Sequence, residues 1–320
     1  MTAMKDYVCA TADDIRSTVE RYGVAILTDV MTPEENQKII DQVWSTYEKV
    51  IPGFKRDDTT TWPRRIDTQC LYAMLDHCHG IGHGRAMWTV REHPAVANAF
   101  ATIYNIDKND LLTSFDGMSF HLPTEITKFG ASPTADWFHT DQRPEIPSFD
   151  CIQSWFTPIN VHGQQDATIE VLVGSNAVVQ SLSSTTEHTG RDWVKFSDKD
   201  IAKWFSNCKR VRISCPAGSM VFWDSRTLHQ GVKPKQSRAT PNIRMAMYVC
   251  MMPRSLADDS TLRKRIQAYE QHRMSTHHPI RFNLQSLKSH LRFAKPAKLN
   301  YPDFPDQLTA FGRRLVGYEH

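Results

Sequence analysis

A histidine and an aspartate separated by one residue, His139 and Asp141, stand in the stretch TADWFHTDQRPE, directly after two large aromatic residues. In an extended or turn segment, residues i and i+2 point to the same side, so these two side chains are able to bind one metal ion. A third ligand is needed, and His229 in SMVFWDSRTLHQG follows a predicted strand. Two histidines and a carboxylate on one face leave other positions of an octahedral iron open, as in the facial triad of non-haem Fe(II) oxygenases.

Other histidines compete for a metal role. The stretch DHCHGIGHGRAMW carries His77, His79 and His83, and their spacing would suit zinc. Asp76 and Cys78 are the nearby side chains that would complete such a set. We interpret this glycine-rich loop as a lid over a binding pocket rather than as a metal site.

An oxygenase of this type needs an electron donor, and a cosubstrate with two carboxylates needs a cation at its far end. Arg244 opens the apolar stretch RMAMYVCMM. There it would place a positive charge, able to bind a carboxylate through two hydrogen bonds, at the start of a buried strand. Arg238 is nearer to His229 in the sequence, but it lies in the turn-rich stretch KPKQSRATP. Arg244 is therefore the favoured cation.

The elements around these residues change character along the chain. Capping residues and periodicity predict helices over about 11–23 and 32–50, with the strand VAIL between them. From about residue 110, short β-like runs alternate with turn residues, which is typical of an antiparallel barrel or jelly roll.

The predicted fold is mostly β with flanking helices, around a double-stranded β-helix (jelly-roll, cupin-like) core. The chain is expected to form one domain with three parts, namely a helical N-terminal part of about residues 1–107, a jelly-roll core of about 108–253, and a helical and irregular C-terminal extension of about 254–320.

Composition narrows the class of protein. With 40% hydrophobic and 23% charged residues, the 320-residue chain is typical of soluble globular proteins. We expect an intracellular, cytoplasmic protein, because the sequence has no secretory signal and no apolar run long enough to span a membrane. The seven scattered cysteines form no C-x-x-C pair, so they are expected to be reduced thiols.

Charge argues weakly about partners. The net charge of +3 is too small to indicate nucleic-acid binding by itself. From Arg254 onward the chain is basic, either as the solvated face of an extension or as a positive rim that attracts an anionic substrate. The sequence leaves homo-oligomerisation open.

Five segments, in order, resemble the phytanoyl-CoA dioxygenase-like branch of the Fe(II)/2-oxoglutarate-dependent oxygenases: HTDQ, IQSWFTPIN, ATIEVLVGSN, GSMVFWDSRTLHQG and RMAMYVC. The resemblance covers roughly residues 80–252. It implies that His139, Asp141 and His229 bind Fe(II), with O₂ as a cosubstrate. It also implies that Arg244 pairs with the distal carboxylate of 2-oxoglutarate.

The resemblance places further residues. Trp155 occupies a position where a side chain packs on the cosubstrate, and Gln153 shares its face of the strand. Halogenating relatives replace the metal-binding carboxylate with a small residue, so the presence of Asp141 argues against halogenation. The loop from His229 to Arg244 is longer than is usual in the family.

These observations predict a hydroxylase that acts on an unactivated C–H bond of a small polar or anionic metabolite. Asp116, Ser119, Arg85 and His83 are candidates for binding this substrate, although Asp116 is equally suited to closing a turn at the following glycine. The alternative is a cupin-like metal-dependent hydrolase or isomerase that uses the same ligands without 2-oxoglutarate.

Overall fold

The computed structural model of the chain describes residues 2–68, 75–76, 79–128, 136–143, 146, 148–182, 193–236, 238–285 and 300–319. His77 and Cys78 of the predicted lid lie outside the described residues. None of the helices in the described part of the chain is long and apolar enough to cross a membrane.

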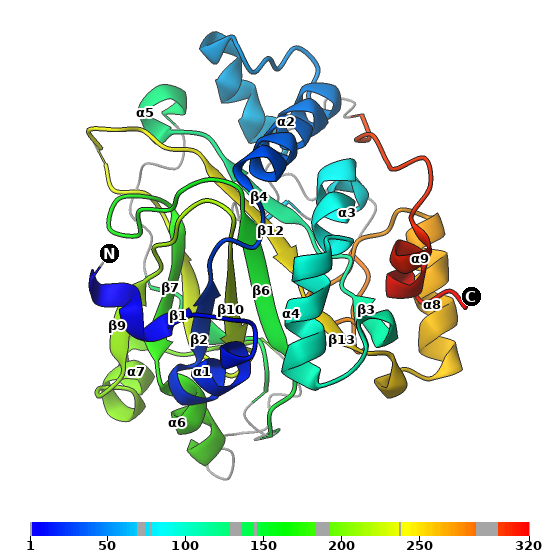
Figure 1. Ribbon diagram of the computed structural model, residues 1–320. Coiled ribbons are helices and arrows are strands. Elements are labelled where there is room, and N and C mark those ends of the chain that lie inside the picture. The colour runs from blue at the N-terminus through cyan, green and yellow to red at the C-terminus, as the bar shows by residue number, and fades with distance from the viewer. Residues whose placement is uncertain are drawn as a thin grey trace.

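The larger of two main sheets has the strand order β1-β2-β10-β6-β12-β4 (Figure 1). Its neighbouring strands are antiparallel, apart from the parallel pair β1 and β2. In this order the strands are Val8–Cys9, Val24–Leu27, Ser219–Asp224, Ile152–Thr157, Arg244–Val249 and Met118–His121.

The smaller main sheet is antiparallel, with the strand order β8-β5-β11-β7-β9. In this order its strands are Val194–Lys195, His139–Thr140, His229–Val232, Thr168–Val173 and Lys209–Arg212. A separate pair joins β3 (Leu111–Thr113) to β13 (Met251–Pro253).

Helices surround the sheets, and Figure 1 shows α3 and α4 beside the larger sheet with α8 and α9 beyond them. The α-helices, α1 to α9 in order, are Asp14–Tyr22, Pro33–Val50, Arg85–Arg91, Pro94–Tyr104, Thr124–Thr127, Ser175–Leu182, Asp198–Trp204, Asp259–Glu270 and Ala310–Val316. The 3₁₀ helices, η1 to η5, are Thr2–Tyr7, Thr59–Thr68, Ile81–His83, Lys108–Asp110 and Arg254–Leu256. The longest of these helices, α2, begins with a capping box in which Thr32 and Glu35 bond to each other's backbone N–H.

Strand alternation separates two layers of core. On β6, Phe156 packs with Trp44 and Phe100 in the cluster between the larger sheet and the helices. Trp155, the neighbouring residue, points the other way and packs with Val171 of the smaller sheet. The inward faces of the two main sheets therefore meet, and polar residues with the same parity as Trp155 point into the space between them.

The prediction of a mostly β chain is wrong, because the described residues contain more helix than strand. The reason is length: the strands have two to six residues, whereas α2 alone has 18. Helices also form where irregular structure was predicted, namely α3 within the glycine-rich region and α9 near the C-terminus.

Arg265 of α8 joins the C-terminal elements to the β3 strand. Its guanidinium is fully buried and donates hydrogen bonds to the carbonyl oxygens of Thr113, Pro279, Leu315 and Val316, at 2.6 to 2.9 Å. One side chain thus satisfies four carbonyl groups from three segments, which holds α9 and the loop after α8 against the sheet pair.

We expect Arg265→Ala to lower the free energy of unfolding by about 3–5 kcal/mol, because four buried carbonyls lose their donor. Urea denaturation followed by circular dichroism measures the change. Arg263→Ala, on the exposed side of the same helix, is the control and should shift stability by less than about 0.5 kcal/mol. Equal stabilities of the two variants would contradict this role for Arg265.

Candidate metal centre

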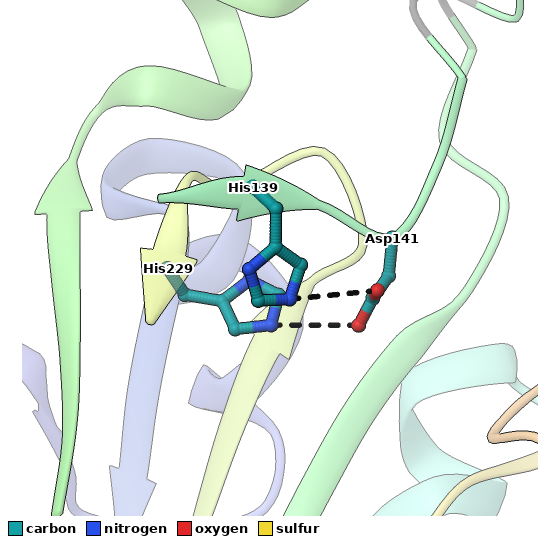
Figure 2. Close-up of side chains that lie close together, drawn as sticks. All are labelled: His139, Asp141 and His229. Atoms are coloured by element: carbon teal, nitrogen blue, oxygen red, sulfur yellow. Dashed lines mark ion pairs between the residues drawn. The ribbon is translucent and has the colours of Figure 1, made fainter. Parts of the chain in front are cut away.

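The two histidines of the predicted triad lie directly opposite each other on paired strands. His139 of β5 pairs with His229 of β11, and their imidazole rings are 4.3 Å apart between centroids. Asp141 follows β5, and its carboxylate faces both rings (Figure 2). Its oxygens lie 3.7 Å from Nε2 of His139 and 3.4 Å from Nε2 of His229. The structure thus brings the three predicted residues together, although His229 lies 90 positions after His139 in the chain.

Each imidazole is oriented by its other nitrogen. Nδ1 of His139 lies 3.2 Å from the carbonyl oxygen of Trp137, and Nδ1 of His229 lies 2.9 Å from that of Thr227. A carbonyl oxygen only accepts, so Nδ1 must carry the proton in both rings. Nε2 is then left with a free lone pair. This is the tautomer in which Nε2 can bind a metal ion.

The charge state of the triad also suits a cation. Burial and the neighbouring His229 lower the pKa of His139 to about 4, against the opposing effect of Asp141, so this imidazole is neutral near pH 7. Burial alone would raise the pKa of Asp141, but the adjacent imidazole of His229 and the nearby His139 and His277 hold the pKa of this carboxyl well below its usual range. A neutral imidazole and an ionised carboxylate are the forms that bind a divalent metal.

The spacing fits a single ion. The ligand atoms of His139, Asp141 and His229 all lie within 4.8 Å of one another. Ligand atoms that sit side by side on an octahedral ion, about 2.1 Å from it, are roughly 3 Å apart. Small side-chain movements would therefore bring all three onto one metal ion.

Two glutamines hold the triad in place. Gln153 of β6 donates a hydrogen bond of 3.0 Å to Asp141, which ties the carboxylate to the larger sheet. Gln230, next to His229 but on the outer face of β11, accepts from the backbone N–H of Trp137 and donates to Asp136 and Glu170. The sequence prediction missed Gln230, because a residue outside the ligand face gives no signal without the strand pairing.

A polar group extends from the triad along the inward face of the larger sheet. Trp155 lies two residues beyond Gln153, and the guanidinium of Arg244 stands over its ring at 5.5 Å. Arg244 donates to the carbonyl oxygen of Ala167 at 3.1 Å and to the hydroxyl of Tyr248 at 3.3 Å. No carboxylate among the described residues pairs with Arg244, although it is buried.

Two more polar atoms lie on this face. Nε1 of Trp155 is buried and has no hydrogen-bond partner in the described part of the chain. Tyr248, which the sequence prediction missed, lies 3.2 Å from Ser119 between the two hydroxyl oxygens. Counting in steps of two from Arg244 would have found Tyr248 as a residue of the same face.

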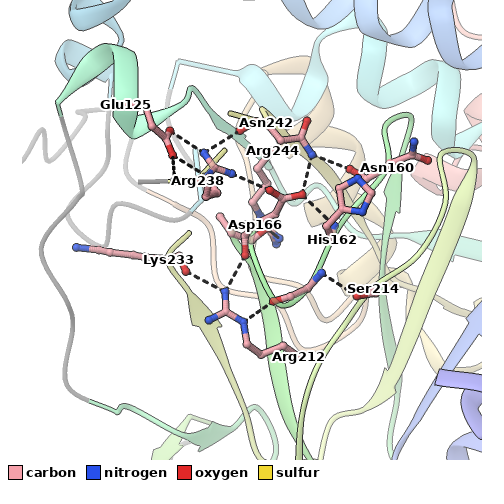
Figure 3. Close-up of polar contacts among 12 residues, drawn as sticks. Glu125, Asn160, His162, Asp166, Arg212, Ser214, Lys233, Arg238, Asn242 and Arg244 are labelled. Atoms are coloured by element: carbon pink, nitrogen blue, oxygen red, sulfur yellow. Dashed lines mark hydrogen bonds and ion pairs between the residues drawn. The ribbon is translucent and has the colours of Figure 1, made fainter. Parts of the chain in front are cut away.

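The competing arginine is already neutralised. Arg238 forms ion pairs with Glu125 at 2.9 Å and with Asp166 at 2.7 Å, and both acids lie beside it in Figure 3. Asn242 donates to the same Asp166, at 2.8 Å. Arg238 therefore belongs to a structural network, in which its charge is already balanced by two carboxylates.

The remaining predicted substrate residues lie in different surroundings. His83 is buried beside Phe115, bonds through Nε2 to a backbone carbonyl, and burial lowers its pKa to about 3. Arg85 is on the surface of α3 near Asp306, at 3.9 Å. Neither has a recorded contact with the triad. Asp116 accepts from the backbone N–H of the next residue, as a turn-closing aspartate does.

A second group with metal-binding side chains does not fit a metal. Asp150, Cys151 and His278 lie together. Nδ1 of His278 accepts from the backbone N–H groups of Ile280 and Arg281, so its proton is on Nε2, toward Asp150. Neither nitrogen of His278 has a free lone pair. Within the described ranges, no metal-binding group was found in the glycine-rich loop.

The fold and site together define a protein with two facing β-sheets and a candidate two-histidine, one-carboxylate metal centre between them. No family model matches the chain. It is 27% identical over 286 residues to Ava biosynthesis cluster protein O of Aspergillus versicolor, covering 85% of this chain and 88% of that protein.

A second relative carries a name that bears on the site. The chain is 22% identical over 271 residues to a protein of Dictyostelium discoideum named "Putative phytanoyl-CoA dioxygenase", covering 74% of each. Among solved structures, one titled "Putative Oxidoreductase from Salmonella typhimurium LT2" shares the fold, with a TM-score of 0.59 at 12% identity over 96% of this chain and 82% of that one. The chain is thus similar to phytanoyl-CoA dioxygenase-like proteins, which confirms the resemblance found in the sequence.

Removing one ligand tests the triad. We expect His139→Ala and Asp141→Ala to reduce bound Fe(II) from about one ion per chain to near zero, because two ligands hold a divalent ion weakly. Metal content is measured by elemental analysis after anaerobic loading and desalting. The control is His83→Ala, whose folded fraction should keep its metal. Loss of metal in the control but not in the two ligand variants would contradict the assignment.

Proposed function

We propose that this protein is an Fe(II)- and 2-oxoglutarate-dependent oxygenase that hydroxylates an unactivated C–H bond of a small polar or anionic metabolite. In this proposal the two sheets form a double-stranded β-helix core within a single oxygenase domain. His139, Asp141 and His229 are the iron ligands, and Arg244, Trp155 and Gln153 serve the cosubstrate.

The observation that carries the proposal is a buried cation, Arg244, which has no anionic partner among the described residues and lies on the same inward face as the candidate metal ligands. Burying a charge without a partner is costly, so a site that keeps one is suited to an anionic ligand. Gln153, which bonds to Asp141, and Trp155, which lies under the guanidinium of Arg244, are two residues apart on the same face of β6. A dicarboxylate with one end at the metal and the other at Arg244 matches this arrangement. A hydrolase or isomerase would have no use for it.

The residues of the chain divide the work. With iron, 2-oxoglutarate and O₂ bound, the centre would supply an oxidant able to cleave a C–H bond. Gln153 orients the Asp141 carboxylate so that the ligands occupy one side of the ion. Arg244 and the hydroxyl of Tyr248 would hold the distal carboxylate by charge-assisted hydrogen bonds. Trp155 would donate its indole N–H, which has no partner among the described residues, to the same ligand. Its ring would shield that ligand from water.

Support for the cofactors comes from the tautomers and charge state of the triad and from the relatives. We propose Fe(II) as the metal, with 2-oxoglutarate and O₂ as cosubstrates. The partner is a small-molecule substrate. Of the residues predicted to bind it, Asp116 lies near enough to His277 that its charge, like that of Asp141, helps to raise the pKa of His277 to about 9 against the opposing effect of burial. Ser119 lies instead at the cosubstrate end, next to Tyr248.

The proposal predicts that 2-oxoglutarate, added without oxygen to the Fe(II)-loaded protein, gives the weak visible metal-to-ligand charge-transfer band of a chelated 2-oxo acid. Arg244→Ala should raise the dissociation constant at least about thirtyfold, since truncating one partner of a buried ion pair costs roughly 2–5 kcal/mol. Spectral titration measures both values.

Arg238→Ala is the matched control, because Arg238 is a buried arginine six residues away that already has carboxylate partners. Its folded form, checked by circular dichroism, should bind 2-oxoglutarate within threefold of the wild type. Bound iron with no band would favour the cupin-like alternative. A loss of affinity in Arg238→Ala but not in Arg244→Ala would move the cosubstrate site to the Arg238 network.

A further inference from the structure

One tryptophan beside the metal centre is unusually open. Trp193 is 49% exposed, whereas Trp155 and Trp223 near the same centre are almost completely buried. Single exposed apolar residues are ordinary on protein surfaces, so exposure alone indicates nothing. The exposure of Trp193 matters because its position in the sheet puts its ring beside the candidate metal centre.

The pairing of β5 with β8 sets this position. His139 is opposite Lys195, and Thr140 is opposite Val194. The same antiparallel register, continued by one residue, places Trp193 across from Asp141. Residues directly opposite each other share one face of a sheet, so Trp193 is on the face that carries the metal ligands. Its ring centroid is 5.3 Å from that of His139, at an angle of 34°.

The triad is not completely sealed from solvent. The side chain of Asp141 is 17% exposed, compared with 6% for His139 and 7% for His229. A substrate bound at the triad lies within reach of Trp193, because the ring of Trp193 is next to that of His139.

The indole of Trp193 is also free to bind. Trp137, which stacks on His139 at 4.7 Å, is fixed by a hydrogen bond from its Nε1 to the carbonyl oxygen of Gly231. Trp193 makes no hydrogen bond to any residue that the structure describes, and His139 is its one ring neighbour there. Much of its ring surface therefore has no protein partner.

Resting on the proposed function, we propose that Trp193 is the substrate platform of this enzyme and that the substrate presents a planar, unsaturated ring to it. Two flat rings stack in an offset arrangement that adds attraction beyond the area they bury, which an aliphatic group of similar size does not gain. Stacking there would place the ring beside Asp141, with its neighbouring C–H bonds next to the metal ligands. The proposal narrows the substrate from any small polar metabolite to a polar metabolite that contains a planar ring.

The test uses two neutral probes, N-acetyl-L-tryptophanamide and N-acetyl-L-leucinamide, titrated anaerobically into the Fe(II)- and 2-oxoglutarate-loaded protein. A ligand beside the metal perturbs the charge-transfer band, so the band reports binding without turnover. We expect the indole probe to bind at least tenfold more tightly than the leucine probe. Trp193→Ala should weaken the indole probe at least tenfold, and Trp193→Phe should keep its affinity within about threefold.

The matched control is Trp204→Ala. Trp204 is 40% exposed, lies under the ammonium group of Lys203 at 4.3 Å, and has no recorded contact with the triad. This variant should bind the indole probe like the wild type.

Three results would overturn the platform: equal affinity for the two probes, unchanged affinity in Trp193→Ala, or no response of the wild-type band to either probe. These results differ from failure of the proposed function, which would show as the absence of the band with 2-oxoglutarate alone. In that case the platform proposal falls together with the function on which it rests.

Discussion

The candidate site depends on the register between β5 and β11. Because His139 and His229 are directly opposite each other on paired strands, two imidazoles from distant parts of the chain lie side by side. A slip of one residue would turn either histidine to the other face of the sheet and dismantle the site. The Gln230 network on the outer face bridges Asp136, Trp137 and Glu170, and so ties together the segments that fix this register.

The two main sheets make separate contributions that meet at one contact. The smaller sheet and the residues that follow its β5 strand carry the three metal-binding side chains, whereas the larger sheet carries Trp155, Arg244 and Tyr248. The hydrogen bond from Gln153 to Asp141 links the two groups. Close packing of the apolar residues between the sheets fixes their separation, so the distance from the candidate metal ligands to Arg244 is set by the core rather than by loops.

Period-two spacing made much of the site predictable. It put His139 and Asp141 on one side of the chain and placed Gln153 with Trp155. The apolar stretch that Arg244 opens, rather than this spacing, favoured Arg244 over Arg238. The structure brings the triad together and leaves Arg244 without a carboxylate partner in its described part, while their roles in binding iron and 2-oxoglutarate stay predictions. Trp193 and Gln230 were beyond this reasoning, because their importance comes from cross-strand register, which sequence spacing does not contain. The helical content was also underestimated, since short strands give a β-like cadence without contributing many residues.

Three buried arginines show how this fold distinguishes structure from binding. Arg265 is satisfied by four carbonyl oxygens from three segments, and Arg238 by two carboxylates. Arg244 has only two long hydrogen bonds in the described part of the chain, although it is equally removed from water. Burying its charge with no carboxylate partner among the described residues costs free energy in the free protein. An anion that accepts hydrogen bonds from Arg244 would remove this cost. Binding of the anion would therefore also raise the free energy of unfolding. Of these three arginines, Arg244 is therefore the one that would gain most from an anionic ligand.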